Sequence, residues 1–173
     1  IFMAVDNLEE RKGATSEIEP VIEEEISFKT KGIDGRIQEF EISSATVPLA
    51  AKALHCEESR IAKTLSFHIG EKVILIVAAG DAKIDNTKYK AQFGTKAKML
   101  SFDEAELLTG HAVGGICPFA VNEGVEIYLD ISLKRFHTVF PACGNSNSAI
   151  ELSIKELEEY SDFIKWIDVC KIL

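Results

Sequence analysis

The residues whose types and spacing best suit chemistry lie in one short stretch, Gly114 to Phe119, which reads Gly-Gly-Ile-Cys-Pro-Phe. Paired glycines permit positive φ angles and let a ligand approach the main chain closely. Pro118 restrains Cys117 to an extended conformation and has no amide hydrogen to donate. The stretch therefore has the composition of a loop that directs backbone amides toward a bound group. A tight turn after a strand over residues 112–116 explains the same glycines, and this alternative stays open.

Cys117 raises a second hypothesis, that of a thiol nucleophile. A catalytic thiol needs a lowered pKa and a base beside it, and His111, six residues earlier, is the nearest candidate in the sequence. His111 follows Gly110 at the start of the expected strand, so spacing alone does not make the two side chains face each other. Cysteine is also common as a small buried apolar residue, which is the simpler interpretation.

Lysines supply the remaining candidates. Lys63 begins an apolar strand, where a long cationic side chain can contact a phosphate or a ribose. Five further lysines occupy sixteen residues, and they are Lys83, Lys88, Lys90, Lys96 and Lys98. This cluster can attract a few phosphates, although a solvated lysine face explains it equally well.

Composition limits the class of protein. The 173 residues carry a net charge of −9, yet residues 52–98 hold nine basic and five acidic side chains. A general nucleic-acid binder presents a broad basic face, so we expect contact with only a few phosphates and no DNA binding. The longest apolar run, Val73 to Ala79, is far shorter than the roughly 20 residues that span a bilayer. No secretory signal opens the sequence.

The four cysteines and four histidines show neither a disulfide framework nor metal-ligand spacing. We therefore expect no metal and no cofactor. The reducing cytoplasm is the simplest location for such a chain, with no contact with a membrane.

Hydrophobic periodicity and capping residues predict mixed helices and strands. Helices are expected over residues 18–31, 47–55 and 85–93, and after the capping boxes at Ser101 and Ser153. Strands are expected over residues 36–42, 63–69, 72–79, 112–116, 125–129, 138–142 and 149–152. The tail from residue 162 to 172 fits either an edge strand or the end of a packed helix.

The order of these elements favours an α+β fold. Strands and helices mix without strict βαβ alternation, and Gly70-Glu71 joins two apolar strands as a hairpin at the centre of the core. We expect a single domain over residues 1–173, with a curved mixed sheet, largely antiparallel or barrel-like, flanked by helices.

Several of these segments occur together in an order that resembles the YbaK/EbsC family. They are Arg60 to Leu65, the hairpin after it, Asp85 with Lys88, Ser101 to Ala105, and Val113 to Phe119. Members of this family are free-standing aminoacyl-tRNA deacylases related to the editing insertion of bacterial prolyl-tRNA synthetase. The resemblance runs from about residue 26 to residue 160.

The resemblance implies hydrolysis of a wrongly attached amino acid from the acceptor end of a transfer RNA, with the proline transfer RNA as the expected substrate. Prolyl-tRNA synthetase is the partner that the resemblance implies. The reaction would be metal-free, with water attacking the ester and a ribose hydroxyl of the substrate assisting. The amino acid stays open, because Asn145 to Ser148 departs from the stretch found in cysteine-editing members.

The resemblance also assigns roles to residues. Lys63 matches an essential lysine that contacts the 3′-terminal adenosine, and Gly114 and Gly115 match a loop whose amides form an oxyanion hole. The residues assigned to substrate binding are Ile116, Cys117, Pro118, Phe119, Gly144 and Lys88. Cys117 stands where a hydroxyl residue is common.

Two other functions remain open from sequence. One is a non-catalytic module that binds an aminoacyl or nucleotide end in the same pocket. The other is a thiol-dependent hydrolase of a small ester that uses Cys117.

Overall fold

The computed structural model describes residues 32–173. Its strands are β1 (Gln38–Glu39), β2 (Ile61–Ile69), β3 (Lys72–Ala79), β4 (Ala82–Ile84), β5 (Glu126–Asp130), β6 (Thr138–Pro141), β7 (Ser148–Ala149), β8 (Leu152–Ser153), β9 (Lys165–Ile167) and β10 (Cys170–Ile172). Its α-helices are α3 (Val47–Leu54), α4 (Asn86–Phe93), α5 (Phe102–Thr109) and α6 (Ile154–Tyr160), and its 3-10 helices are η1 (Asp34–Arg36), η2 (Glu58–Arg60) and η3 (Ile131–Arg135).

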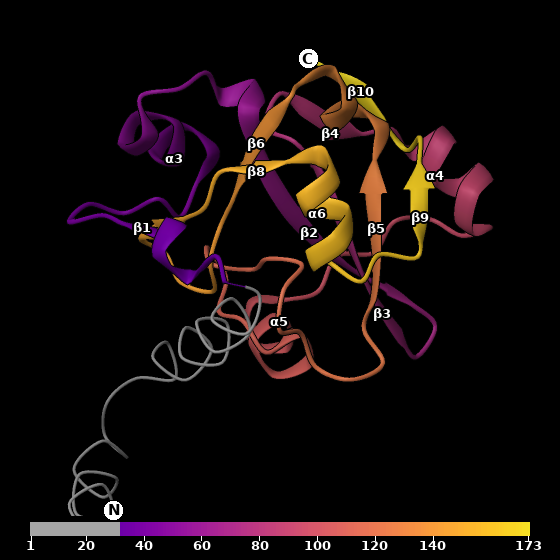
Figure 1. Ribbon diagram of the computed structural model, residues 1–173. Helices are drawn as coiled ribbons and strands as arrows, with labels where there is room; N and C mark the ends of the chain where they lie inside the picture. The colour runs from indigo at the N-terminus through magenta and orange to yellow at the C-terminus, as the bar shows by residue number, and fades with distance from the viewer. Residues whose placement is uncertain (1–31) are drawn as a thin grey trace, which may run out of the picture.

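A six-stranded sheet in the order β8-β6-β2-β3-β5-β9 forms the centre of the fold. The hairpin of β2 and β3 pairs antiparallel over eight residue pairs, whereas β2–β6, β3–β5 and β5–β9 pair in parallel. Figure 1 shows the sheet curling, with β6 and β9 on opposite sides of β5. The α+β class and the curved mixed sheet expected from the sequence are confirmed.

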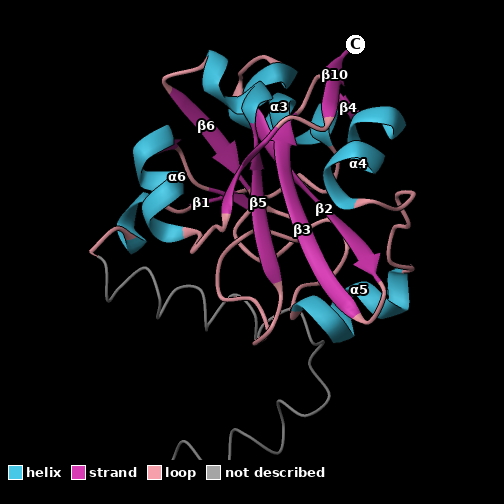
Figure 2. Cartoon of the chain, turned by 90° about the vertical axis from the view of Figure 1, so that its right-hand side faces the viewer, coloured by secondary structure: helices cyan, strands magenta, loops and turns pink. Residues whose placement is uncertain are grey.

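Helices cover the sheet from several sides, and Figure 2 shows α6 and α4 on its two flanks, with α5 near the turn end of the β2–β3 hairpin. The middle of β3, residues 74–77, is completely buried because helices and loops cover both faces of this central strand. Tyr89 of α4 packs against Phe67 of β2, with ring centroids 5.3 Å apart. Burial of this apolar hairpin is the main source of stability.

Most of the predicted element ends coincide with observed caps. Thr46 accepts a hydrogen bond from the amide of Leu49 at the start of α3, and Asp85 caps α4 in the same way. Both capping boxes are present, one at Ser101 and one at Ser153. Short polar side chains satisfy the first amides of a helix, which is why these positions could be read from sequence.

Three predicted strands differ from the structure. Residues 112–116 form a loop, because Gly114 adopts a φ of +95° and the amide of Gly115 closes a turn onto the carbonyl of Ala112. The strand expected over residues 36–42 is reduced to the two residues of β1, and the one over 149–152 is divided between β7 and β8. The tail forms strands β9 and β10. The helix expected over residues 18–31 lies outside the described residues.

Candidate active site

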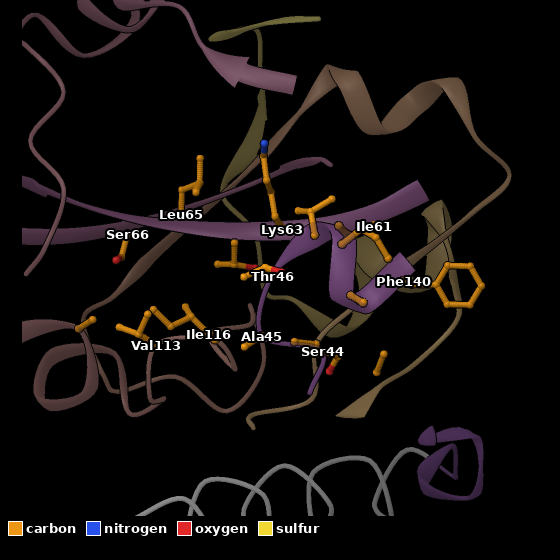
Figure 3. A pocket seen from close by; sticks show the side chains of 18 of the residues that line it. Ser44, Ala45, Thr46, Ile61, Lys63, Leu65, Ser66, Val113, Ile116 and Phe140 are labelled. Carbon is orange, nitrogen blue, oxygen red and sulfur yellow. The ribbon is translucent and has the colours of Figure 1, made fainter. Parts of the chain in front are cut away.

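A cavity of about 360 Å³ lies beside β2. It is lined by residues 44–47 at the start of α3, residues 61–66 of β2, and the loop at 113, 114 and 116. Side chains from β6, β7 and the region of residues 99–105 complete it. Figure 3 shows Ala45, Thr46, Val113 and Ile116 on one side of β2, where the walls of the cavity converge.

The cavity adjoins an unpaired stretch of strand edge. On the edge of β2 that faces away from β3, β6 pairs only with Ile61 and Ala62. Further along, Ser66 accepts a hydrogen bond from the amide of Leu100 at 3.1 Å. Within residues 32–173, no strand pairs with the part between these two points. Since alternate residues of a strand direct their main-chain groups to the same edge, Thr64 presents its amide and carbonyl there.

Two hydroxyls in the cavity wall are buried without a hydrogen-bond partner among the described residues. They are Oγ of Ser44, in the segment before α3, and Oγ1 of Thr64, on β2. A buried hydroxyl that makes no hydrogen bond is costly, and most native proteins avoid it. The wall of the cavity is therefore prepared for a polar ligand group, although most of the other residues that line it are apolar.

The glycine pair fits the loop closely against two neighbouring segments. A Cβ atom on Gly114 would lie 2.9 Å from Cβ of Ala45, and its positive φ disfavours other residues. A Cβ atom on Gly115 would lie 2.5 Å from the main chain of Asn145. Gly114 lines the cavity, whereas Gly115 donates its amide to Ala112 at 3.0 Å. The amide of Gly115 thus has a partner within the turn, and its part in an oxyanion hole stays a prediction.

Lys63 lies at the cavity, but its ammonium group points elsewhere. In Figure 3, Lys63 and Leu65 extend from β2 on the side opposite Ala45. The Nζ atom donates to the carbonyl of Gly80 at 3.2 Å and also to the carbonyl of Ala82. Burial lowers the pKa of this half-buried lysine, an effect that Cys170 and Asp81 oppose. The sequence predicted that Lys63 lies at the pocket, but it gave no indication that the ammonium group points toward Gly80 and Ala82.

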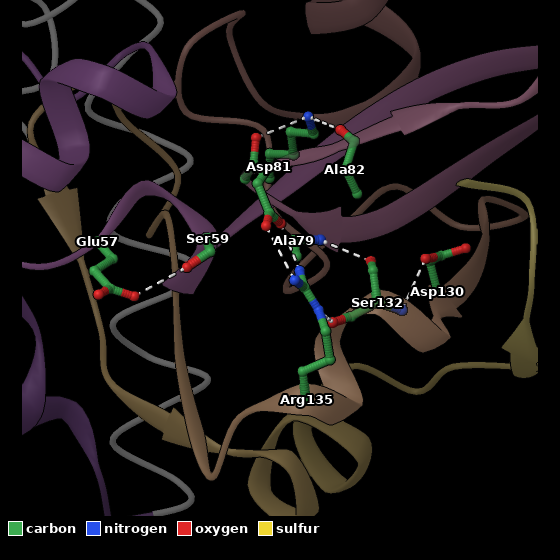
Figure 4. Close-up of polar contacts among 10 residues, drawn as sticks. Glu57, Ser59, Ala79, Asp81, Ala82, Asp130, Ser132 and Arg135 are labelled. Atoms are coloured by element: carbon green, nitrogen blue, oxygen red, sulfur yellow. Dashed lines mark hydrogen bonds and ion pairs between the residues drawn. The ribbon is translucent and has the colours of Figure 1, made fainter. Parts of the chain in front are cut away.

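The turn that holds the Lys63 ammonium is itself fixed. Figure 4 shows Arg135 of η3 binding the carboxylate of Asp81, with Nη1 and Oδ2 3.0 Å apart. The hydrogen bond from Arg135 holds the pKa of Asp81 below its ordinary value. Gly80 has no room for a side chain, since a Cβ atom there would lie 1.9 Å from the carbonyl oxygen of Glu58. The two acceptors of Lys63 are thus rigidly placed.

Cys117 and His111 do face each other, with Sγ and Nε2 3.5 Å apart. Both side chains are fully buried, and neither lines the cavity. Nε2 of His111 also lies 2.6 Å from the carbonyl oxygen of Phe119. The pair therefore contacts the chain after the glycine loop and lies outside the lining of this cavity.

Of the other candidates, only Ile116 lines the cavity. Pro118 and Phe119 are buried outside it, and Gly144 forms a turn with a φ of +84°. Lys88 lies on α4, where its ammonium group binds Asp168 at 2.8 Å and the carbonyl of Cys170 at 3.0 Å. These four residues do not line this cavity, and their contacts with a substrate stay a prediction.

Sequence reasoning missed the hydroxyls of Ser44 and Thr64. Thr64 follows Lys63 directly, but an alternating strand gives no sign of which stretch of its edge stays unpaired. Ser44 precedes the helix cap Thr46 and reads as an ordinary loop residue. Only the packing of the segment before α3 against β2 identifies both.

Comparison with known proteins assigns the family. The family model of the aminoacyl-tRNA editing domain matches residues 43–160, which include most of the residues that line the cavity. This chain belongs to the aminoacyl-tRNA editing domain family. The resemblance to YbaK-type deacylases is thereby confirmed.

Relatives of this editing domain fall into two groups. It is 61% identical over 136 residues to the uncharacterized protein YwhH of Bacillus subtilis (strain 168), covering 78% of this chain and 87% of YwhH. It is 30% identical over 78 residues to a proline–tRNA ligase of Bacillus cytotoxicus, covering 44% of this chain and 14% of that ligase.

Solved structures share the fold of the editing domain. A crystal structure of a candidate trans-editing enzyme for prolyl-tRNA synthetase matches with a TM-score of 0.78 and 25% identity, over 88% of this chain and 97% of that one. The hypothetical protein APE2540 matches with a TM-score of 0.72 and 27% identity, over 82% and 98%.

Residues 32–173 of the editing domain contain neither a metal-binding cluster nor a membrane-spanning helix. No group of three or more His, Cys, Asp or Glu side chains is placed to hold a metal ion. No helix in this range is long and apolar enough to cross a membrane.

Proposed function

We propose that this editing domain is a deacylase that acts in trans, hydrolysing the ester between a wrongly attached amino acid and a transfer RNA, with the proline transfer RNA as substrate. The observation that carries this proposal is the cavity at the unpaired edge of β2, with Gly114, Thr64 and Ser44 in its wall. The likeness to a candidate trans-editing enzyme supports the choice of transfer RNA.

In this proposal the aminoacyl group enters the cavity and its ester carbonyl lies against the main chain of Thr64 and Gly114. Amides fixed in place around a developing oxyanion are worth about 3 kcal/mol each in the transition state. A water molecule adds to the carbonyl carbon, the bond to the ribose oxygen breaks, and the neighbouring ribose hydroxyl relays the proton to that oxygen. The products are the free amino acid and the uncharged transfer RNA.

The size of the amino acid is inferred from the cavity walls. Ile61, Phe140 and Ile116 contribute bulky apolar side chains to these walls. Excluding a larger side chain by sterics is easier than rejecting a smaller one by affinity, so small amino acids are the proposed substrates. The hydroxyls of Ser44 and Thr64 then bind the polar groups of the aminoacyl moiety, including its ammonium group.

Lys63 is proposed as the anchor of the 3′-terminal nucleotide. For this role its flexible side chain must leave the carbonyls of Gly80 and Ala82 and turn toward a phosphate or ribose at the rim. Burial lowers the pKa of Lys63 in the free protein, and a phosphate bound beside its ammonium group would oppose that shift. We expect Lys63→Ala to lose most turnover with the fold retained.

The test of the function uses purified chain and proline transfer RNA charged separately with alanine, cysteine, serine and proline. Loss of the ester is followed for wild type, Lys63→Ala and the matched control Lys88→Ala, whose ammonium group also binds a carbonyl but which does not line the cavity. Selective loss of one mischarged species, abolished only in Lys63→Ala, supports the proposal.

Two other results would contradict it. Tight binding of a mischarged transfer RNA without turnover would assign the cavity to a binding module. Equal turnover of all four esters would contradict the editing role. Turnover that survives Lys63→Ala would contradict the role of Lys63 as an anchor.

A further inference from the structure

Three apolar side chains stand exposed at the mouth of the cavity. Phe102 is 77% exposed, Met99 is 57% exposed and Val113 is 42% exposed, and all three line the cavity. Scattered apolar residues on a surface are ordinary, but a group of them at the rim of one cavity marks a binding site. The aromatic ring and the thioether together form what we call the rim platform, defined as Met99 and Phe102.

The rim platform is held firmly, although its side chains are exposed. The amide of His68 donates to the carbonyl of Lys98 at 2.8 Å, and Met99 forms a bridge to Phe67 on β2. Phe102 is the first residue of α5, directly after the cap Ser101. Because the backbone of both residues is held by these hydrogen bonds, little conformational entropy is lost when a ligand binds to the rim platform.

Basic residues precede the rim platform along the chain. Lys96 and Lys98 precede Met99 along the same segment, and Lys96 lines a second hollow together with Lys90 of α4. Residues 52–98 are the only third of the chain with more basic than acidic side chains. Charge complementarity therefore favours an anionic ligand next to an apolar one, and an aromatic surface flanked by cations is typical of single-stranded nucleic-acid sites.

We propose that the rim platform stacks on the terminal adenine of the aminoacylated strand while Lys96 and Lys98 bind the phosphates on its 5′ side. The proposal rests on the proposed function, since it names the part of the transfer RNA that each surface contacts. Stacking on Phe102 sets the position of the ribose, and the ester attached to that ribose then reaches the cavity. Phe102 thus binds the terminal nucleotide before the chemical step.

The test measures stacking directly. The probe is an uncharged acceptor-stem minihelix in which 2-aminopurine replaces the terminal adenine, because its fluorescence falls when it stacks on a ring. We expect quenching by wild type and by Phe102→Trp, and loss of quenching with Phe102→Ala and Phe102→Leu. Leu107→Ala is the matched control, since Leu107 is 76% exposed on the same helix and does not line the cavity.

Turnover of the mischarged transfer RNA gives a second readout. We expect Phe102→Ala to raise KM about tenfold with kcat nearly unchanged, since one stacked base is worth roughly five- to 150-fold in binding. Lys96→Ala and Lys98→Ala weaken binding of the minihelix less, and their effect shrinks at high salt.

The two proposals fail in different ways. If wild type quenches the probe through Phe102 but hydrolyses no ester, the platform stands and the deacylase function falls. If wild type hydrolyses an ester but Phe102→Ala matches Leu107→Ala in quenching and KM, the platform is overturned. The platform proposal is also overturned if the wild-type protein does not quench the probe. It is overturned as well if truncating Met99 or Phe102 only converts a dimer to a monomer in sedimentation.

Discussion

Gly114 and Gly115 meet different demands although they are neighbours of the same type. Gly114 needs a positive φ and lines the cavity, whereas Gly115 gives its space to the main chain of Asn145. The close approach at Gly115 is what joins the glycine loop to the segment before β7. The shape of the cavity wall therefore depends on a residue that does not itself line the cavity.

Replacing Gly115 should disturb this packing. We expect Gly115→Ala to lower the free energy of unfolding by about 1–3 kcal/mol, because a Cβ atom 2.5 Å from backbone forces the two loops apart. Gly35→Ala is the matched control, since nothing lies within 4 Å of a Cβ atom there. Chemical denaturation of both variants measures the effect, and equal stability of the two would contradict the packing role.

The buried thiol of Cys117 should be inert. We expect iodoacetamide to modify the partly exposed Cys56 in the native protein and to leave the fully buried Cys117 unmodified. Peptide mass mapping gives the site of modification. Activity should survive both the alkylation and Cys117→Ser, and inactivation that follows modification of Cys117 would restore the thiol mechanism.

Sequence identified the types of several site residues but not their directions. The glycine loop and Lys63 could be singled out from the sequence because paired glycines, and a lysine at the start of an apolar strand, are distinctive there. The direction of the Lys63 ammonium depends on the carbonyls of Gly80 and Ala82, a turn made by a different part of the chain. The hydroxyl of Thr64 was missed because its place in the cavity wall depends on a strand edge that the other elements leave unpaired.

At the scale of elements, α6 is fixed at its start by charge. Glu156 completes the capping box with Ser153, and Arg36, the last residue of η1, binds the same carboxylate. The hydrogen bond from Arg36 is the main cause that holds the pKa of Glu156 at about 2, below its ordinary 4.5. This contact joins the segment before α3 to the helix after β8.

The lowered pKa of Glu156 predicts a pH dependence. The charged form is favoured in the fold, so its contribution is full above pH 4.5 and is lost as the pH falls toward 2. We expect Glu156→Gln to cost about 1 kcal/mol near neutral pH. The difference from wild type should vanish near pH 2 in denaturant titrations. Glu159→Gln, an exposed carboxylate on the same helix, is the control, and a pH-independent difference would contradict the account.

Elements with local signals were predicted well. Thr46, Ser101 and Ser153 begin their helices as expected, and the β2–β3 hairpin is where its apolar runs place it. The loop at residues 112–116 was misread because its apolar residues resemble a strand while its glycines turn the chain. The short strand β4 was missed because it depends on pairing with β10, which is distant in sequence.

At the scale of the whole molecule, charge limits contact with nucleic acid to a small area. The net charge is −9, and the basic side chains near the cavity are few. We expect the affinity for the acceptor minihelix to fall with salt at a slope of about −2 on a log–log plot, as for three phosphates on a single strand. A slope steeper than about −6 in a salt titration would indicate a broad basic face instead.

The central claim is that the cavity beside β2 holds the aminoacyl group, and filling it tests the claim most directly. Ala142→Leu adds bulk inside the cavity, while Ala53→Leu adds the same bulk on α3 outside it. The measurement is the single-turnover rate of ester loss from the mischarged transfer RNA. We predict a fall of at least tenfold for Ala142→Leu and no change for Ala53→Leu. Equal, undiminished rates in both folded variants would contradict the account.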